Sequence, residues 1–120
     1  MDAEAVVRDL CAAFPRKDVE ELLGFFSEDA VYEKIPVGRF EGPDEIRGTL
    51  EEFFGPEVEI EFELRNVGVC GDQVYVERII HFTTHSGRIS LPAMAIFEVT
   101  PAGKVSAWRD YFDRRQAGLD

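Results

Sequence analysis

The chain has 120 residues and a formal net charge of −11 at pH 7. This length predicts one domain, residues 1–120, that buries roughly two thirds of its unfolded surface. The negative charge excludes nucleic acids and anionic membranes as partners, because both bind clustered Lys and Arg. The acidic start, Met1–Glu4, is unlike a signal peptide, and no apolar stretch approaches the roughly 20 residues of a membrane span. We therefore expect a soluble, cytoplasmic protein.

The first part of the chain carries helical signals. Asp18, with Glu21 three residues later, forms a capping-box pattern that begins a helix through the apolar run Leu22–Phe26. Ala30–Tyr32 then predicts a short strand. An earlier helix is predicted by apolar residues at helical spacing: Val6, Val7, Leu10, Ala13 and Phe14.

A third helix is predicted to open at Gly42–Asp44 and to stop at Gly55-Pro56. Its apolar positions are Ile46, Leu50, Phe53 and Phe54. From Glu57 onward the pattern alternates with a period of two, and every second residue of Glu57–Leu64 is acidic. This pattern is typical of a strand with one buried and one solvated face.

Three further strands are predicted, separated by Gly-containing turns: Gln73–Thr83, Arg88–Val99 and Lys104–Phe112. Helices followed by such a run of strands favour an α+β fold. We expect a cone in which a curved, mainly antiparallel sheet and three helices enclose an apolar pocket.

The last strand contains the most informative segment, Trp108–Asp113. Regular alternation places Trp108, Asp110 and Phe112 on one face. Asp110 is thereby aimed into an aromatic interior. Burial of a carboxylate costs several kcal/mol unless it is paired or hydrogen-bonded, so Asp110 requires partners.

Four segments resemble the limonene-1,2-epoxide hydrolases, a branch of the nuclear transport factor two-like superfamily that also holds ketosteroid isomerases and polyketide cyclases. They are Tyr32–Pro36, Glu77–Ile80, Leu91–Phe97 and Trp108–Asp113. The similarity extends over nearly the whole chain. It implies a cystatin-like α+β fold, although a shared fold does not carry a shared reaction.

In such hydrolases a Tyr, an Asn and an Asp hold the attacking water, while an Arg-x-Asp motif supplies a bridging Arg and an acid. The resemblance assigns the Tyr to Tyr32, the bridging Arg to Arg78 and the water-activating Asp to Asp110. Lys34 stands where the Asn is expected, and Ile80 stands where the acid is expected. Epoxide opening requires a proton donor at the leaving oxygen, which Ile80 cannot supply. We therefore expect ordinary epoxide hydrolysis to be weak or absent.

The comparison with ketosteroid isomerases implies no catalytic pair either, since Ile35 and Ala95 stand at its base and acid positions. Alternation places His81 on the face away from Arg78, and His85 lies in a turn. No ligand set for a metal is visible, and no cofactor is expected. Cys11 and Cys70 are interpreted as reduced, since neither belongs to a Cys-x-x-Cys motif.

The predicted pocket is apolar. Small residues among large aromatic ones suggest that it accepts a monoterpene-sized or flat bicyclic molecule. The expected ligand is therefore a small apolar epoxide, carbonyl compound or carboxylic acid. The lining is expected from eight residues: Ile80, Phe82, Leu91, Ala93, Ala95, Phe97, Trp108 and Phe112.

Two cations, Lys34 and Arg78, face one carboxylate, Asp110, in this interior. A buried Lys tends to lose its proton, and a neutral Lys34 amine would be a nucleophile able to form a Schiff base with an aldehyde or ketone. Tyr32 would then donate a hydrogen bond, Asp110 transfer protons and Arg78 hold an oxyanion. Catalysis by Asp110 acting as a general base is the other catalytic alternative. Two alternatives involve no catalysis: Lys34 forms a structural ion pair with Asp110, or Lys34 and Arg78 bind an apolar carboxylate.

The outer sheet face also carries apolar residues, which a monomer would leave exposed: Ile79, Met94, Ile96 and Tyr111. We expect a homodimer through the sheet, which the family resemblance also implies.

Overall fold

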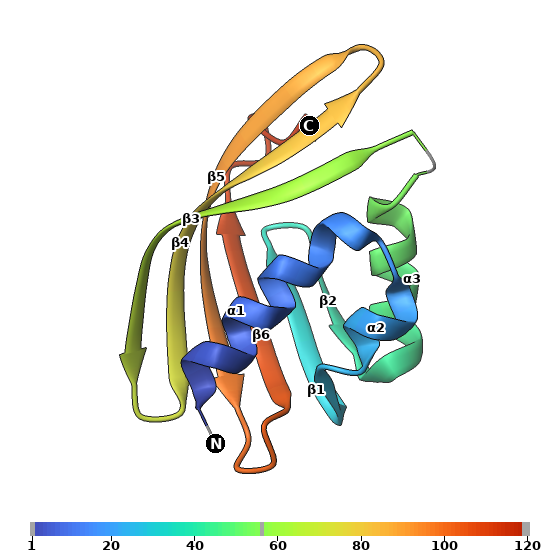
Figure 1. Ribbon diagram of the computed structural model, residues 1–120. Helices are drawn as coiled ribbons and strands as arrows, with labels where there is room; N and C mark the ends of the chain where they lie inside the picture. Colours follow the sequence, from blue (N-terminus) through green and yellow to red (C-terminus); the bar gives the residue numbers. More distant parts are fainter. Residues whose placement is uncertain (1, 56, 119–120) are drawn as a thin grey trace.

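The computed structural model describes residues 2–55 and 57–118 (Figure 1). It contains three α-helices, α1 (Ala3–Ala13), α2 (Val19–Leu23) and α3 (Gly42–Phe53), and a single 3-10 turn, η1 (Phe14–Arg16). Six strands form one sheet: β1 (Phe26–Ile35), β2 (Gly38–Glu41), β3 (Glu59–Cys70), β4 (Gln73–Thr84), β5 (Gly87–Val99) and β6 (Val105–Phe112). The predicted α+β class is confirmed.

The sheet is curved and mostly antiparallel, with the strand order β2-β1-β6-β5-β4-β3. Strands β3 to β6 follow one another as antiparallel neighbours, and β1 joins β6 as the one parallel pair within the described residues. This parallel pairing sets Lys34 directly opposite Asp110. Two positions far apart in the chain are thereby brought to the same level of the sheet.

The helices lie on one side of the sheet, as Figure 1 shows. Helices α1 and α2 each begin at an aspartate whose side chain accepts a backbone hydrogen bond, Asp2 from Ala5 and Asp18 from Glu21. The apolar face of α1 packs against β3, β4 and β5. On the opposite sheet face the alternating glutamates of β3 are exposed, as their pattern predicted.

Several element boundaries differ from the prediction. The second helix ends at Leu23 and β1 already begins at Phe26, where it pairs with Val105. The run Leu22–Phe26 is apolar throughout, so periodicity alone could not divide it between helix and strand. The short strand β2 was not predicted, and β3 continues past Leu64 to Cys70 after a register shift. The predicted helix stop is Gly55-Pro56, and its second residue, Pro56, lies outside the described residues.

Within residues 2–55 and 57–118, no helix has both the length and the apolarity needed to cross a membrane.

Candidate active site

A cavity of about 410 Å³ opens between the inner sheet face, the C-terminal end of α3 and the segment after β6. This volume lies within the range of small-molecule sites. Most of the lining is apolar, and three charged side chains, Lys34, Glu52 and Asp110, interrupt it. The other lining residues are Tyr32, Val37, Phe53, Val58, Ile80, Phe82, Thr84, Ile89, Leu91, Phe112 and Ala117.

The structure places four of the eight residues predicted for the lining at this cavity. Ile80, Phe82, Leu91 and Phe112 line the cavity. The other four predicted residues lie deeper in the core: Ala93, Ala95, Phe97 and Trp108.

Trp108 fills the space that the prediction assigned to a ligand. Its ring stacks on Tyr32 with centroids 4.2 Å apart and on Phe97 with centroids 5.0 Å apart. Stacked aromatic rings of this kind close-pack the interior instead of leaving a wall open to a ligand. The cavity therefore begins on the far side of Tyr32.

The two alanines also have a different role from the one predicted. Ala93 lies opposite Arg78 in the sheet, and Ala95 lies opposite Asp110. Strand β5 separates the strands that carry the two charged residues. Small side chains at these positions leave room for the Arg78 side chain to pass over β5 and reach Asp110.

Arg78 and Asp110 form a buried, bidentate ion pair. Nη1 and Nη2 of Arg78 donate to Oδ1 and Oδ2 of Asp110, each at 2.8 Å. Arg78 is completely buried, and Asp110 is 2% exposed. Burial acts to lower the pKa of Arg78, but the adjacent Asp110 outweighs it, so the pKa is raised. Arg78 is thus the partner that the buried Asp110 carboxylate requires. Arg78 itself does not line the cavity.

The alternative that Lys34 pairs with Asp110 is wrong. Arg78 already engages both oxygens of that carboxylate. Nζ of Lys34 donates instead to Oγ1 of Thr49, a buried residue of α3. Nζ also lies 4.2 Å from the ring centroid of Phe53. Among the residues that the structure describes, Lys34 forms no ion pair.

This environment changes the acidity of Lys34. Burial lowers the pKa of its amine from 10.5 to about 8, while the charges of Glu52 and Asp110 oppose the decrease. At pH 7 roughly one molecule in ten then carries the neutral amine. Lys34 is mainly a cation that can release a proton near physiological pH.

Tyr32 has the opposite tendency. Burial is the main cause that raises the pKa of its phenol well above the ordinary value, and the charge of Asp110 adds to it. The hydroxyl therefore stays protonated. Tyr32 borders the cavity, and no hydrogen bond of its hydroxyl occurs within residues 2–55 and 57–118. It is available as a donor to a bound molecule.

Sequence reasoning missed the contribution of α3. Thr49, Glu52 and Phe53 all face Lys34 or the cavity, and their spacing of three and four residues places them on one side of the helix. The signal was present, because Thr49 and Glu52 interrupt the apolar face of this helix at helical spacing. Its apolar positions alone indicate a face packed against the core.

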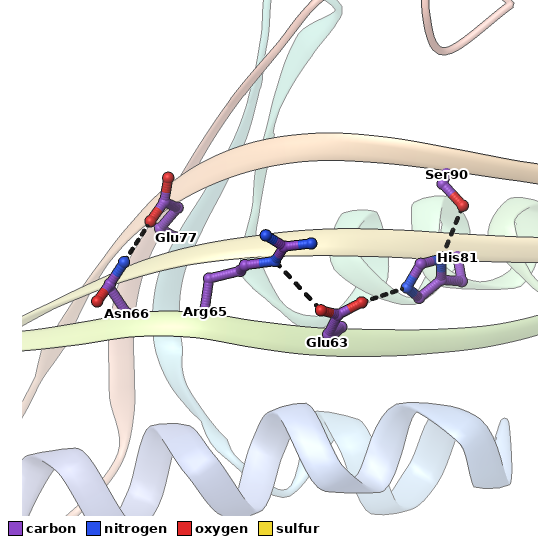
Figure 2. Close-up of polar contacts among 6 residues, drawn as sticks. All are labelled: Glu63, Arg65, Asn66, Glu77, His81 and Ser90. Atoms are coloured by element: carbon purple, nitrogen blue, oxygen red, sulfur yellow. Dashed lines mark hydrogen bonds and ion pairs between the residues drawn. The ribbon is translucent and has the colours of Figure 1, made fainter.

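The histidines lie apart from the cavity. His81 projects from the outer face, where Nδ1 is 2.8 Å from Oγ of Ser90 and Nε2 is 2.9 Å from Oε1 of Glu63 (Figure 2). His85 is exposed beside Glu57. Within the described ranges, no cluster of three or more His, Cys, Asp or Glu residues is arranged to hold a metal.

Several known proteins are similar to this chain. A curated relative, epoxide hydrolase EphG of Mycobacterium tuberculosis, is 28% identical over 101 residues. The alignment covers 84% of this chain and 66% of the relative, so the chain spans just under two thirds of that protein's length.

Solved structures agree on the fold. An LEH-like epoxide hydrolase of M. tuberculosis gives a TM-score of 0.82 at 26% identity, covering 95% of this chain and 84% of that one. The epoxide hydrolase/cyclase-like enzyme SalBIII, described in pyran ring formation in polyether salinomycin, gives 0.80 at 23% identity, covering 95% and 92%. The architecture is that of nuclear transport factor two-like proteins.

The profile of the SnoaL-like domain matches residues 7–108. The matched segment contains Tyr32, Lys34, Arg78 and Ile80 and ends two residues before Asp110. The chain therefore belongs to the SnoaL-like domain family, on a scaffold related to epoxide hydrolases and polyketide cyclases.

Proposed function

We propose that this chain is a small-molecule enzyme that uses the amine of Lys34 to form a Schiff base with an apolar aldehyde or ketone. The observation that carries the proposal is the state of Lys34. Its amine borders an apolar cavity, its pKa is lowered to about 8, and it lacks an ion-pair partner among the described residues. A lysine amine with a lowered pKa is the typical nucleophile of this chemistry.

The reaction begins with the neutral amine of Lys34. Its lone pair forms a bond to the carbonyl carbon, and the electrons of the C=O double bond move to the oxygen. The Tyr32 hydroxyl donates a hydrogen bond to that oxygen as charge develops. Loss of water then gives an imine, which draws electrons from the neighbouring carbon.

Asp110 is suited to remove a proton from that neighbouring carbon. It borders the cavity, and each carboxylate oxygen retains a second lone pair besides the one that accepts from Arg78. Arg78 has a different role from the expected oxyanion contact, because it is buried and bound to Asp110. It acts as a positioning residue that orients the carboxylate.

Residual epoxide hydrolysis is the second candidate, and the 28% identical epoxide hydrolase favours it. Asp110 would activate the water, but Ile80 offers no proton to the leaving oxygen. The ammonium form of Lys34, which lies beside Asp110 in the sheet and lines the cavity, would have to supply that proton. We expect diol formation to be slow.

Binding of an apolar carboxylate is less well supported. That hypothesis needed Arg78 and Lys34 together, and Arg78 does not line the cavity. Two carboxylates, Glu52 and Asp110, do line it. A neutral carbonyl compound avoids the repulsion that an anion would meet there.

Reductive trapping tests the proposal. The protein is incubated with small apolar aldehydes and ketones, treated with borohydride, and measured by intact mass. We expect one stable adduct per chain, with a rate that rises with pH to a midpoint near 8. Lys34→Met should abolish it.

Peptide mapping supplies the matched control, because Lys17 and Lys104 are the other lysines of the chain. Each donates to a backbone carbonyl, Lys17 to Val58 and Lys104 to Gly24. An adduct distributed equally over the lysines, or absent for every carbonyl compound tried, would refute the proposal.

A further inference from the structure

One face of α3 is directed at the Lys34 amine. Thr49 accepts its hydrogen bond, and Phe53 lies under it at 4.2 Å from the ring centroid. Glu52, the residue between them on this helix face, lines the same cavity. The charge of Glu52 is also the strongest influence that opposes the lowering of the Lys34 pKa by burial. Glu52 is therefore the carboxylate of α3 that interacts electrostatically with the Lys34 amine.

Schiff-base formation requires more than a nucleophile. Both protons of the neutral amine must leave the nitrogen and depart with the carbonyl oxygen as water. A group that carries protons from nitrogen to oxygen accelerates this step. The side chains that line the cavity differ in their ability to do so.

Three of them are poorly suited. The Tyr32 phenol holds its proton because its pKa is raised, so it donates hydrogen bonds without exchanging protons. Asp110 already serves the proton of the neighbouring carbon in the proposed reaction, and the Arg78 guanidinium holds its carboxylate in place. Ile80 has no ionisable group. Glu52 differs from all of them, because it is exposed at the cavity and forms no ion pair within residues 2–55 and 57–118.

We propose that Glu52 is the catalytic proton-transfer residue of the Lys34 site. After the amine attacks, the Glu52 carboxylate takes a proton from the nitrogen and gives it to the former carbonyl oxygen. The nitrogen lone pair then forms the C=N bond as the C–O bond breaks and hydroxide departs. Glu52 takes the second proton from the resulting iminium nitrogen and gives it to the hydroxide, so that water leaves and Glu52 returns to its ionised state. This inference rests on the proposed Schiff-base function.

The test compares Glu52→Gln with Glu51→Gln. Both variants remove one negative charge from neighbouring positions of α3, but Glu51 does not line the cavity. The rate of borohydride-trapped adduct formation is measured from pH 6 to pH 10, which separates the midpoint of the profile from its plateau. At the plateau every Lys34 amine is neutral, so the plateau rate reports the steps after deprotonation.

A purely electrostatic role and a proton-transfer role predict opposite results. Loss of the Glu52 charge lowers the Lys34 pKa, and by itself this would speed the reaction at pH 7. If Glu52 transfers protons, its Gln variant has a plateau at least tenfold lower, and Glu51→Gln keeps the wild-type plateau. Glu52→Asp should recover part of the rate.

A Glu52→Gln variant with the wild-type plateau would refute this role and leave Lys34 as the nucleophile. A wild-type protein that forms no adduct would refute the proposed function and this inference together. Circular dichroism of each variant checks that α3 remains folded.

Discussion

Ile80 occupies the position where the resemblance to limonene-1,2-epoxide hydrolases implies an acid. It is 2% exposed, borders the cavity and points to the same sheet face as Arg78, two residues before it. Nε of Arg78 is buried and has no hydrogen-bond partner. An unpaired buried donor destabilises the folded state, so an acceptor placed beside Nε of Arg78 would be stabilising.

We therefore predict that Ile80→Asp increases epoxide hydrolysis. The new carboxyl group would accept from Arg78 and stand in the cavity as the missing proton donor. General acid catalysis typically contributes about 10²–10⁴-fold, and we expect at least a tenfold rise in diol formation from limonene oxide. Gas chromatography of the diol measures it.

Ile80→Asn is the matched control for that variant. It has nearly the same shape and can accept from Arg78, but it has no carboxyl proton to donate. Equal diol formation by the Asn and Asp variants would show that the effect comes from polarity rather than from proton donation.

Lys34 also couples stability to pH. Its pKa in the folded chain is about 8, below the ordinary value of 10.5. The buried ammonium therefore destabilises the folded state below pH 8, and this penalty disappears as the pH rises from 8 to 10.5. Relative to Lys34→Met, the wild type should gain stability over that window by about 1–2 kcal/mol.

Urea denaturation of both proteins at pH 7 and pH 10 measures this difference, because all other groups titrate alike in the two chains. A stability difference that stays constant across the two pH values would mean that the Lys34 amine is fully solvated.

The sequence predicted the identity of the central polar residues better than their pairing. Tyr32, Lys34 and Asp110 do line the cavity. The wrong partner for Lys34 arose because alternation specifies only the face on which a side chain lies. Which cation reaches Asp110 depends on the space over β5, where Ala93 and Ala95 admit the long Arg78 side chain.

Helix α3 influences the pKa of Lys34 through Thr49. A hydroxyl that accepts from an ammonium group stabilises the charged form. Thr49→Val keeps the shape of the side chain and removes this acceptor. We predict that it lowers the Lys34 pKa further below 8, by about one unit, since hydrogen bonds to charged groups contribute about 1.5–3 kcal/mol.

Carbon NMR of the Lys34 side chain gives this titration directly and needs no substrate. Thr49→Ser retains the hydroxyl and should titrate like the wild type. If Thr49→Val also titrates like the wild type, the contact between α3 and β1 does not control the amine.

The three strands bounded by Gly-containing turns were predicted closely, whereas a strand defined by its pairing was not. The strands Gln73–Thr83, Arg88–Val99 and Lys104–Phe112 differ from β4, β5 and β6 by at most one residue at each end. The strand β2 has four residues, and its burial pattern shows no alternation. Such a strand is defined by its pairing with β1, which the local sequence does not encode.

The two faces of the sheet differ in what packs against them. The helices lie over one face (Figure 1), and the other face carries apolar side chains between polar groups such as those in Figure 2. Met94 and Tyr111 lie opposite each other on adjacent strands and are 40% and 42% exposed. Ile79 and Ile96 on the same face are partly buried.

We predict that this outer face joins two copies of the chain. A two-fold interface brings the same patch of each copy together, so one apolar surface serves both partners. Sedimentation should give twice the chain mass of 13.6 kDa. Met94→Glu combined with Tyr111→Glu should produce a monomer, because like charges would then meet across the interface.

Val69→Glu is the control for this pair, since Val69 is 51% exposed but belongs to the opposite side of the sheet, where its partner Val74 is buried. A dimer that persists in the double variant and is lost in Val69→Glu would contradict this prediction, because the interface would then lie on the side of the sheet that carries Val69. The cavity is lined by the inner sheet face, α3 and the segment after β6, so a dimer through the outer face leaves its lining uncovered. Adduct formation at Lys34 should then be the same in the monomeric variant and in the wild type.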